Sequence, residues 1–129
     1  MHELSLCRAL ITAAERALAS RPDHAGQRLH RLAVSVGALS GCEPALLAHL
    51  FPHATPGTRA AGAELDIRFQ PAVVVCDDCA ARAEVAVHQL CCPICRSPRV
   101  RLVEGDGVYL VGMSLCADPL PETETEHVR

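Results

Sequence analysis

The first segment of the chain, residues 3–19, spaces its apolar positions with the period of a helix, and its charged residues fall largely on the other faces. Such a stripe packs one side of a helix against a core, so the pattern predicts an amphipathic helix. Pro22 disfavours helical backbone at Arg21, which ends the pattern. The stripe consists of Leu4, Cys7, Leu10, Ile11, Ala14 and Leu18.

A strand and a second helix are predicted next. Residues 29–39 alternate with a period of two, which is typical of a strand, and the Ser-Gly pair at 40–41 provides a turn. A helix is then expected from about Pro44, because the fixed φ of proline suits a first helical position. Either Pro52 or the Thr-Pro-Gly sequence at 55–57 is expected to end this helix.

The second half of the chain predicts two strands on either side of a cysteine-rich segment. Residues 63–70 alternate cleanly, which predicts a half-buried strand with one wet face. The cysteine-rich segment spans 72–104, and after a Gly-Asp-Gly turn residues 108–115 form the last predicted strand. The tail, 117–129, contains two prolines and four acidic residues and is expected to be disordered.

The cysteine-rich segment contains two Cys-x2-Cys motifs separated by twelve residues. Two residues between cysteines let both sulfurs of one turn point at one metal, and two such turns complete a tetrahedron of thiolates. A closed shell of four soft ligands favours structural zinc and leaves no open position for catalysis. Disulfides or a redox motif are the alternatives, but a thioredoxin-like site needs only one Cys-x2-Cys. The predicted zinc ligands are Cys76, Cys79, Cys92 and Cys95.

The chain has eight cysteines, so four lie outside this ligand set. Cys91 stands beside Cys92, but three residues separate it from Cys95, and we expect it to be a spare thiol. Cys7 lies on the stripe of the first helix and is expected to pack as a small apolar residue. Cys42 and Cys116 belong to no motif.

Composition and charge exclude several classes of function. The formal charge is −3 and only 2% of residues are aromatic, so neither phosphate attraction nor base stacking favours nucleic-acid binding. No Ser-His-Asp pattern or glycine-rich phosphate loop points to an enzyme. The N-terminus lacks the apolar core of a signal peptide, and no run approaches a membrane span of about 20 residues. We therefore expect a cytoplasmic protein without a membrane association, in which paired Cys-x2-Cys motifs bind metal.

The N-terminus suggests a second metal site. The α-amine of Met1, the amide nitrogen of His2 and the His2 imidazole Nδ1 can bind one ion together, through a five-membered and a six-membered ring. This planar nitrogen-rich set suits Ni(II) or Cu(II). A histidine near an N-terminus is more often simply solvated, so these residues alone leave the site open.

Several segments in the same order and spacing resemble one family. They are MHELSLCRALI at the start, VSVGALSGCEPALL in the centre, TPGTRAAGAELDI after it, and the motif C-x2-C-x12-C-x2-C. Together they resemble the HypA/HybF family of nickel metallochaperones for [NiFe]-hydrogenase maturation. The resemblance extends from Met1 to about Leu115; the acidic tail does not map onto the family pattern, and Cys91 beside Cys92 offers the zinc site an alternative ligand.

The resemblance implies an α+β fold with two helices on a three-stranded sheet and an inserted zinc-ribbon domain. The expected boundaries are 1–71 and 105–116 for the nickel-binding domain, 72–104 for the zinc ribbon and 117–129 for the tail. The family implies that Ni(II) binds at Met1, His2 and Glu3, with the acidic side chain of Glu43 nearby. For Glu43, a favourable charge at a helix N-terminus is an equally good explanation. The fourth nickel ligand stays open among Glu3, Glu43, His88 and a partner group.

The resulting interpretation is a nickel carrier and not an enzyme. It would deliver Ni(II) with the accessory GTPase HypB to the [NiFe]-hydrogenase large-subunit precursor, while Zn(II) stabilises the ribbon, and a homodimer is left open. The alternative is a zinc-ribbon module for protein or nucleic-acid interaction, because Arg96, Arg99 and Arg101 cluster beside the second cysteine pair. The net negative charge argues against the nucleic-acid version.

Overall fold

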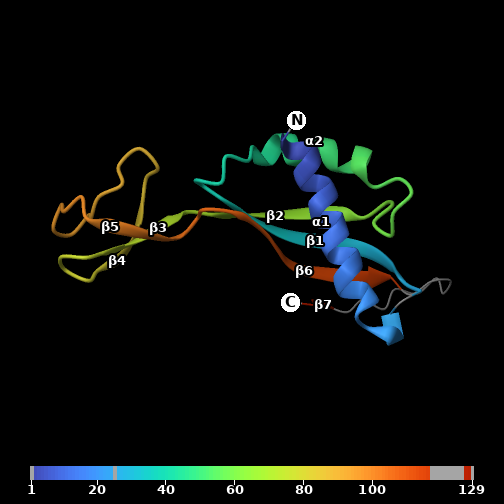
Figure 1. The fold of residues 1–129 in the computed structure, drawn as a ribbon. Coiled ribbons are helices and arrows are strands. Elements are labelled where there is room, and N and C mark those ends of the chain that lie inside the picture. Colours follow the sequence, from blue (N-terminus) through green and yellow to red (C-terminus); the bar gives the residue numbers. More distant parts are fainter. Residues whose placement is uncertain (1, 25, 117–126, 129) are drawn as a thin grey trace. The chain divides into compact units, whose positions relative to one another are not determined.

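The computed structural model describes residues 2–24, 26–116 and 127–128 (Figure 1). The chain forms two compact units. Unit 1 comprises Met1–Val34, Glu43–Ile67 and Tyr109–Arg129, and unit 2 comprises Ser35–Cys42 and Arg68–Val108. The second unit thus contains the cysteine-rich segment together with residues 35–42. Within the described residues, no helix combines the length and the apolar composition needed to cross a membrane.

Unit 1 contains the two predicted helices. The first, α1 (His2–Ala19), buries the expected stripe from Cys7 to Leu18 and is followed by the short 3-10 helix η1 (Pro22–His24). The second, α2 (Pro44–Ala54), buries Leu47 and Phe51. The two helices pack together, and the thiol of Cys7 lies 3.6 Å from the carbonyl oxygen of Leu47. Cys7 is therefore a core residue, as its position on the stripe predicts.

The second helix continues past Pro52 and ends at Ala54, so the second of the two expected stop signals is the one that applies. Pro52 has no N–H to donate to the carbonyl four residues earlier, and α2 ends two residues after it. The hydroxyl of Thr55 donates to the carbonyl of Pro52 at 3.2 Å and satisfies one of the terminal acceptors.

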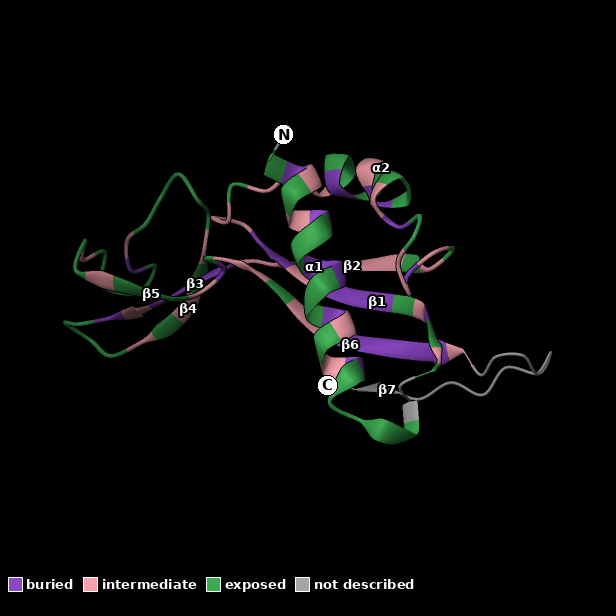
Figure 2. Ribbon diagram, turned by 45° about the vertical axis from the view of Figure 1, so that its right-hand side comes forward, coloured by how far each residue is buried: buried purple, intermediate pink, exposed green. Residues whose placement is uncertain are grey.

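The helices cover a sheet with strand order β2-β1-β6-β7, and both views show α1 lying across it (Figures 1 and 2). The three predicted strands are present, and β7 is a two-residue addition that pairs antiparallel with β6. Buried positions concentrate on β1 and β6 (Figure 2). The bounds are β1 Arg28–Gly37, β2 Glu64–Gln70, β6 Val108–Cys116 and β7 His127–Val128.

Two expectations, the buried face of strand 63–70 and the disorder of the tail, are not fully confirmed. The alternation of residues 63–70 places Phe69 on the buried face, but Phe69 is 63% exposed near the end of β2, which is the edge strand of its sheet. An edge strand has a neighbour on one side only, so fewer groups cover its side chains. The expected disorder of 117–129 stays a prediction, because residues 117–126 and 129 lie outside the described residues. The remaining two residues of that tail form β7.

Unit 2 contains a separate antiparallel sheet with strand order β4-β3-β5. Its strands are β3 (Ala72–Cys76), β4 (Arg82–Val85) and β5 (Val100–Glu104). The central strand β3 is buried over most of its length, whereas β4 alternates exposed and partly exposed positions and β5 is exposed at its three central positions. The helices and sheets confirm the predicted fold class of two helices on a sheet with an additional cysteine-rich ribbon.

Two glycines let the backbone of unit 2 close on itself. The amide of Gly37 donates to the carbonyl of Gly107 at 2.9 Å, and that of Leu39 donates to Gly105 at 2.7 Å. A Cβ atom at position 37 would lie 2.4 Å from the Gly105 carbonyl oxygen. Gly105 has a φ of +98°, which side chains rarely adopt. The contact between these two segments therefore requires glycine at both positions.

We expect Gly37→Ala to destabilise the zinc-loaded protein by about 1–3 kcal/mol, because the added methyl group meets backbone that has no room to move aside. Gly26→Ala is the matched control, since no atom lies within 4 Å of a Cβ built there. Thermal unfolding of the two variants measures the difference. Equal melting temperatures would show that the segments around Gly37 and Gly105 move apart to accommodate the methyl group without a loss of stability.

Candidate metal centre

The structure brings four sulfur atoms of unit 2 together. The Sγ atoms of Cys76, Cys79, Cys92 and Cys95 all lie within 4.8 Å of one another. Two of the separations are short: 3.6 Å between Cys76 and Cys95, and 3.5 Å between Cys79 and Cys92. None of the four forms a disulfide. These are the four residues that the two Cys-x2-Cys motifs indicate, whereas Cys91 is not a member of the group.

The two cysteine pairs have the same local backbone. In the first, the amides of Asp78 and Cys79 approach the Cys76 sulfur at 3.3 and 3.4 Å. In the second, the amides of Ile94 and Cys95 both approach the Cys92 sulfur at 3.4 Å. Amide donors of this kind stabilise a sulfur that carries negative charge. Each turn therefore directs two backbone donors at the sulfur of its first cysteine.

Each turn closes in the same unusual conformation. Ala80 and Arg96, the residues directly after the two pairs, have positive φ angles of 64° and 67°. The Ala80 amide donates to the carbonyl of Cys76 at 3.0 Å, and the Arg96 amide donates to that of Cys92 at 2.9 Å. Non-glycine residues rarely adopt positive φ, and neither alanine nor arginine signals it in the sequence. This feature of the site could not be read from residue type.

The surroundings act in opposite directions on the two cysteines of the second pair. Hydrogen bonds from the backbone N–H groups of Cys95 and, to a lesser extent, Ile94 lower the pKa of the Cys92 thiol to about 6. Burial acts in the opposite direction but is outweighed. The N–H of Ser97 lowers the pKa of Cys95, but burial and the neighbouring thiols outweigh it and raise the value to about 12. Four adjacent thiols thus resist ionising together unless a cation joins them.

A four-coordinate metal fits this arrangement. A tetrahedron of sulfurs at the usual Zn–S distance has edges of roughly 3.8 Å, close to the two short separations. The inner ligands Cys76 and Cys92 are 2% and 1% exposed, whereas Cys79 and Cys95 are exposed. The four cysteines are therefore positioned to bind a metal such as zinc, which would hold the ribbon together and leave no ligand position open.

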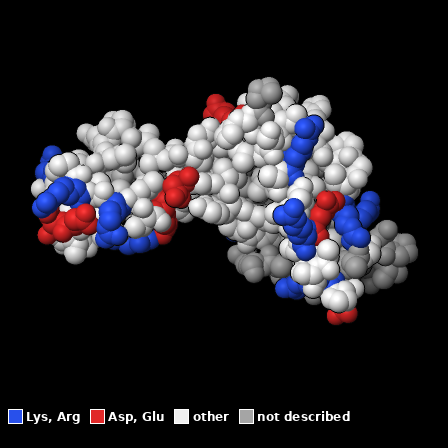
Figure 3. All heavy atoms as spheres, in the orientation of Figure 1, with Lys and Arg blue, Asp and Glu red and all other residues white. Residues whose placement is uncertain are grey.

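Two of the three arginines beside the second cysteine pair form ion pairs with acidic side chains. Arg99 pairs with Asp78, and Arg101 Nε lies 2.9 Å from the carboxylate of Asp77. The Arg99 guanidinium, together with the Ser97 hydroxyl, holds the pKa of Asp78 below its usual range. Figure 3 shows basic and acidic side chains interleaved on this unit. Such a surface lacks the continuous positive charge that phosphate backbones require.

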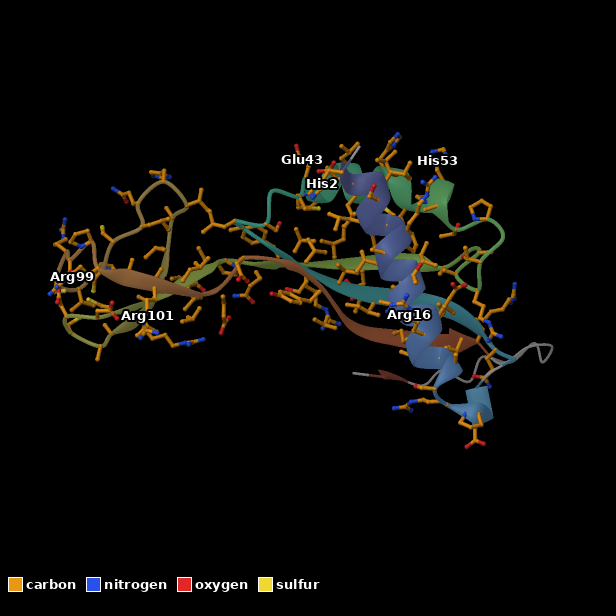
Figure 4. The ribbon with its side chains drawn as sticks, viewed as in Figure 1. His2, Arg16, Glu43, His53, Arg99 and Arg101 are labelled. Carbon is orange, nitrogen blue, oxygen red and sulfur yellow. The ribbon has the colours of Figure 1, made fainter. Side chains whose placement is uncertain are left out.

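His2 and Glu43, two of the predicted nickel residues, lie near each other in unit 1 (Figure 4). Met1 lies outside the described residues. The His2 side chain is 58% exposed, and its Nδ1 lies 3.8 Å from Oε2 of Glu3. Glu3 itself is buried, and its Oε2 accepts a hydrogen bond of 3.0 Å from the backbone amide of Glu43. His2, Glu3 and Glu43 are thus neighbours, whereas His88 is an exposed residue of unit 2.

The contact between Glu3 and Glu43 explains how α2 begins. Glu43 precedes the first helical residue and has no side-chain cap of its own. In many helices a glutamate within the first turn reaches back to this amide. Here α1 supplies the carboxylate, and the Glu43 N–H is the main cause that lowers the pKa of Glu3. Sequence reasoning assigned Glu3 to nickel and missed this contact, which joins residues 40 positions apart.

A sequence-family model described as "Hydrogenase/urease nickel incorporation, metallochaperone, hypA" matches residues 1–115. The chain belongs to the HypA family. This match confirms the resemblance to the family that the N-terminal, central and cysteine motifs indicate. The family is one of metallochaperones for nickel incorporation and hydrogenase maturation.

Individual members of the family are similar to this chain over most of their length. The hydrogenase maturation factor HypA of Nitrosospira multiformis is 36% identical over 115 residues, which cover 89% of this chain and 97% of the relative. HybF of Klebsiella pneumoniae is 40% identical over 106 residues, covering 82% and 91%. The solution structure of the Ni metallochaperone HypA from Helicobacter pylori has the same fold. Its TM-score is 0.63 at 23% identity, with 86% of this chain and 94% of that chain covered.

Cys79→Ser is expected to lower the zinc content of the purified protein from about one ion per chain to well below one, and to unfold the ribbon, because metal binding and folding are coupled in so small a unit. Cys91→Ser is the matched control and should retain its zinc. Metal analysis and the circular dichroism of both variants decide the outcome. A Cys91 variant that loses zinc while Cys92→Ser keeps it would reverse the ligand assignment.

Glu3→Gln should lower stability at neutral pH less than Glu3→Ala, because an amide oxygen can still accept from the Glu43 amide. The pKa of Glu3 is lowered from 4.5 in the native state, so its charge stabilises the fold above that pH and ceases to do so as the pH falls through the native value. The stability difference between wild type and Glu3→Gln should therefore shrink on acidification. Thermal unfolding between pH 7 and pH 3 measures it, and a constant difference contradicts the assignment.

Proposed function

We propose that this HypA-family chain carries Ni(II) at its N-terminus and delivers it for insertion into the [NiFe]-hydrogenase large subunit, while Zn(II) at the four cysteines stabilises unit 2. The observation that carries the proposal is the exposed His2 imidazole at the start of α1, in a chain whose family performs nickel incorporation. A carrier must release its cargo, and an exposed chelate exchanges more readily than a closed shell of four sulfurs.

The proposed nickel ligands are the α-amine of Met1, the amide nitrogen of His2 and the His2 Nδ1. An ion at Nδ1 would lie beside the Glu3 carboxylate, whose Oε2 is 3.8 Å from that nitrogen. The Glu43 amide fixes this carboxylate in place, so negative charge stands next to the chelate before nickel arrives. Glu3 thereby favours a divalent cation electrostatically, and Glu43 stays the weaker candidate for the remaining ligand.

The proposed partners are the accessory GTPase HypB and the large-subunit precursor, in the cytoplasm, with a homodimer as a further possible assembly. The family name supports partners in hydrogenase maturation in general. A protein-interaction role of the ribbon is the second candidate, and Val87, Leu90 and Ile94 favour it, because all three are exposed apolar side chains of unit 2. The paired arginines leave little support for a nucleic-acid partner.

His2→Ala should abolish tight nickel binding and leave zinc at about one ion per chain, because the imidazole is the only side-chain donor of the chelate. Calorimetry with nickel at neutral pH, together with metal analysis, measures both. Equal tight-site affinity in wild type and variant would exclude the N-terminal site.

The α-amine is tested by adding one glycine before Met1. The former amine becomes an amide, whereas a free α-amine has an ordinary pKa of about 8 and is a good donor. Histidine then occupies position three, where an amine, two amides and an imidazole can fill a square plane alone. We expect altered visible absorption and failed nickel transfer to the GTPase. Native spectra with normal hydrogenase maturation would show that the α-amine is not a ligand.

A further inference from the structure

Helix α2 carries two exposed imidazoles one helical turn apart. Its sequence, Pro44–Ala54, contains no Asp, Glu, Lys or Arg, so His49 and His53 are its only polar side chains. Both are exposed, and a spacing of four residues places them on the same helix face. Their ring centres are 6.0 Å apart and the rings are tilted by 58°, so they are neighbours but are not stacked.

This spacing is one from which helices bind transition-metal ions. In His-Glu-x-x-His sequences, two histidines at i and i+4 bind zinc from one helix face. One ion held at 2.0–2.1 Å by a nitrogen of each ring places the ring centres roughly 4.5–6 Å apart, depending on the angle at the metal. The observed 6.0 Å lies at the upper end of this range, so the two exposed rings are close enough for a nitrogen of each to share one ion.

The geometry points to a second metal site in unit 1: His49 and His53 together bind one divalent transition-metal ion through one nitrogen each, with water completing its shell. The choice of Ni(II) as that ion rests on the proposed function, but the site itself does not. Leu50 occupies the position that is glutamate in the zinc peptidase motif, so no general base accompanies the ion. The site binds metal and performs no hydrolysis.

The position of this site on α2 gives it a role in nickel capture. The helix starts beside Glu43, whose amide is bound by Glu3 next to His2. At a rise of 1.5 Å per residue, His49 and His53 lie roughly 9 and 15 Å along the axis from that start. Figure 4 shows His53 near the opposite end of α2 from His2 and Glu43. A two-nitrogen site binds nickel more loosely than the N-terminal chelate, so it holds an exchangeable ion close to the tighter site.

The test removes the N-terminal chelate first. Full-length, zinc-loaded His2→Ala protein is titrated with nickel chloride by calorimetry at pH 8, alone and with His49→Ala, His53→Ala or His30→Ala added. His30, a partly exposed histidine of β1, is the matched control. We expect the His2→Ala protein to bind about one nickel ion weakly. Each change on α2 should weaken this binding by about tenfold or more, since it removes one of two linked ligands, and the His30 change should have no effect.

Thermal unfolding gives a second readout, because a ligand that binds only the native state raises its stability. Nickel should raise the melting temperature of the His2→Ala protein and of its His30 variant, but not of the two α2 variants. Absence of nickel uptake by the His2→Ala protein, equal affinity in all four proteins, or loss on changing only one α2 histidine overturns the proposal. Equal tight-site affinity in wild-type and His2→Ala protein would instead disprove the N-terminal nickel site of the proposed function. It would not contradict the His49–His53 site, which the α2 variants test separately.

Discussion

Four cysteine sulfurs within 4.8 Å of one another place a strong electrostatic constraint on unit 2. The opposite pKa shifts of Cys92 and Cys95 show that backbone amides favour one thiolate while its neighbours oppose the next. A divalent cation would remove this conflict and join β3, the first cysteine turn and the loop before β5. The strands β4 and β5 bury little of their own surface, so such a cation would supply cohesion that a core of this size lacks.

Unit 1 has an apolar core, and polar contacts from α1 to distant backbone amides add to it. Glu3 is 7% exposed, and its carboxylate caps the start of α2 from another helix. The same carboxylate faces the exposed imidazole of His2. The interaction that orders α2 therefore also sets the charge next to the N-terminal chelate. A change in nickel binding on substituting Glu3 does not by itself make Glu3 a ligand.

The parts of the structure that follow local rules could be predicted from the sequence. The stripe on α1, the strand β1 and the spacing within each cysteine pair depend on neighbours within a few residues. Contacts between distant segments could not be predicted. The bond from Glu3 to Glu43 and the close approach of Gly37 and Gly105 exist only once the chain has folded. The positive φ at Ala80 and Arg96 is imposed by the cysteine turns, against the preference of those residue types.

The two kinds of donor set in this chain suit opposite tasks. Four sulfurs, two of them almost fully buried, give a metal no vacant position. Exposed imidazoles at His2, His49 and His53 leave coordination positions to water or to a partner's ligands. A metal passes between proteins by ligand substitution, in which the incoming donor binds before the last outgoing donor leaves. The proposed nitrogen sites of unit 1 permit that step, which is why we place the cargo there and assign a structural metal to the closed sulfur site.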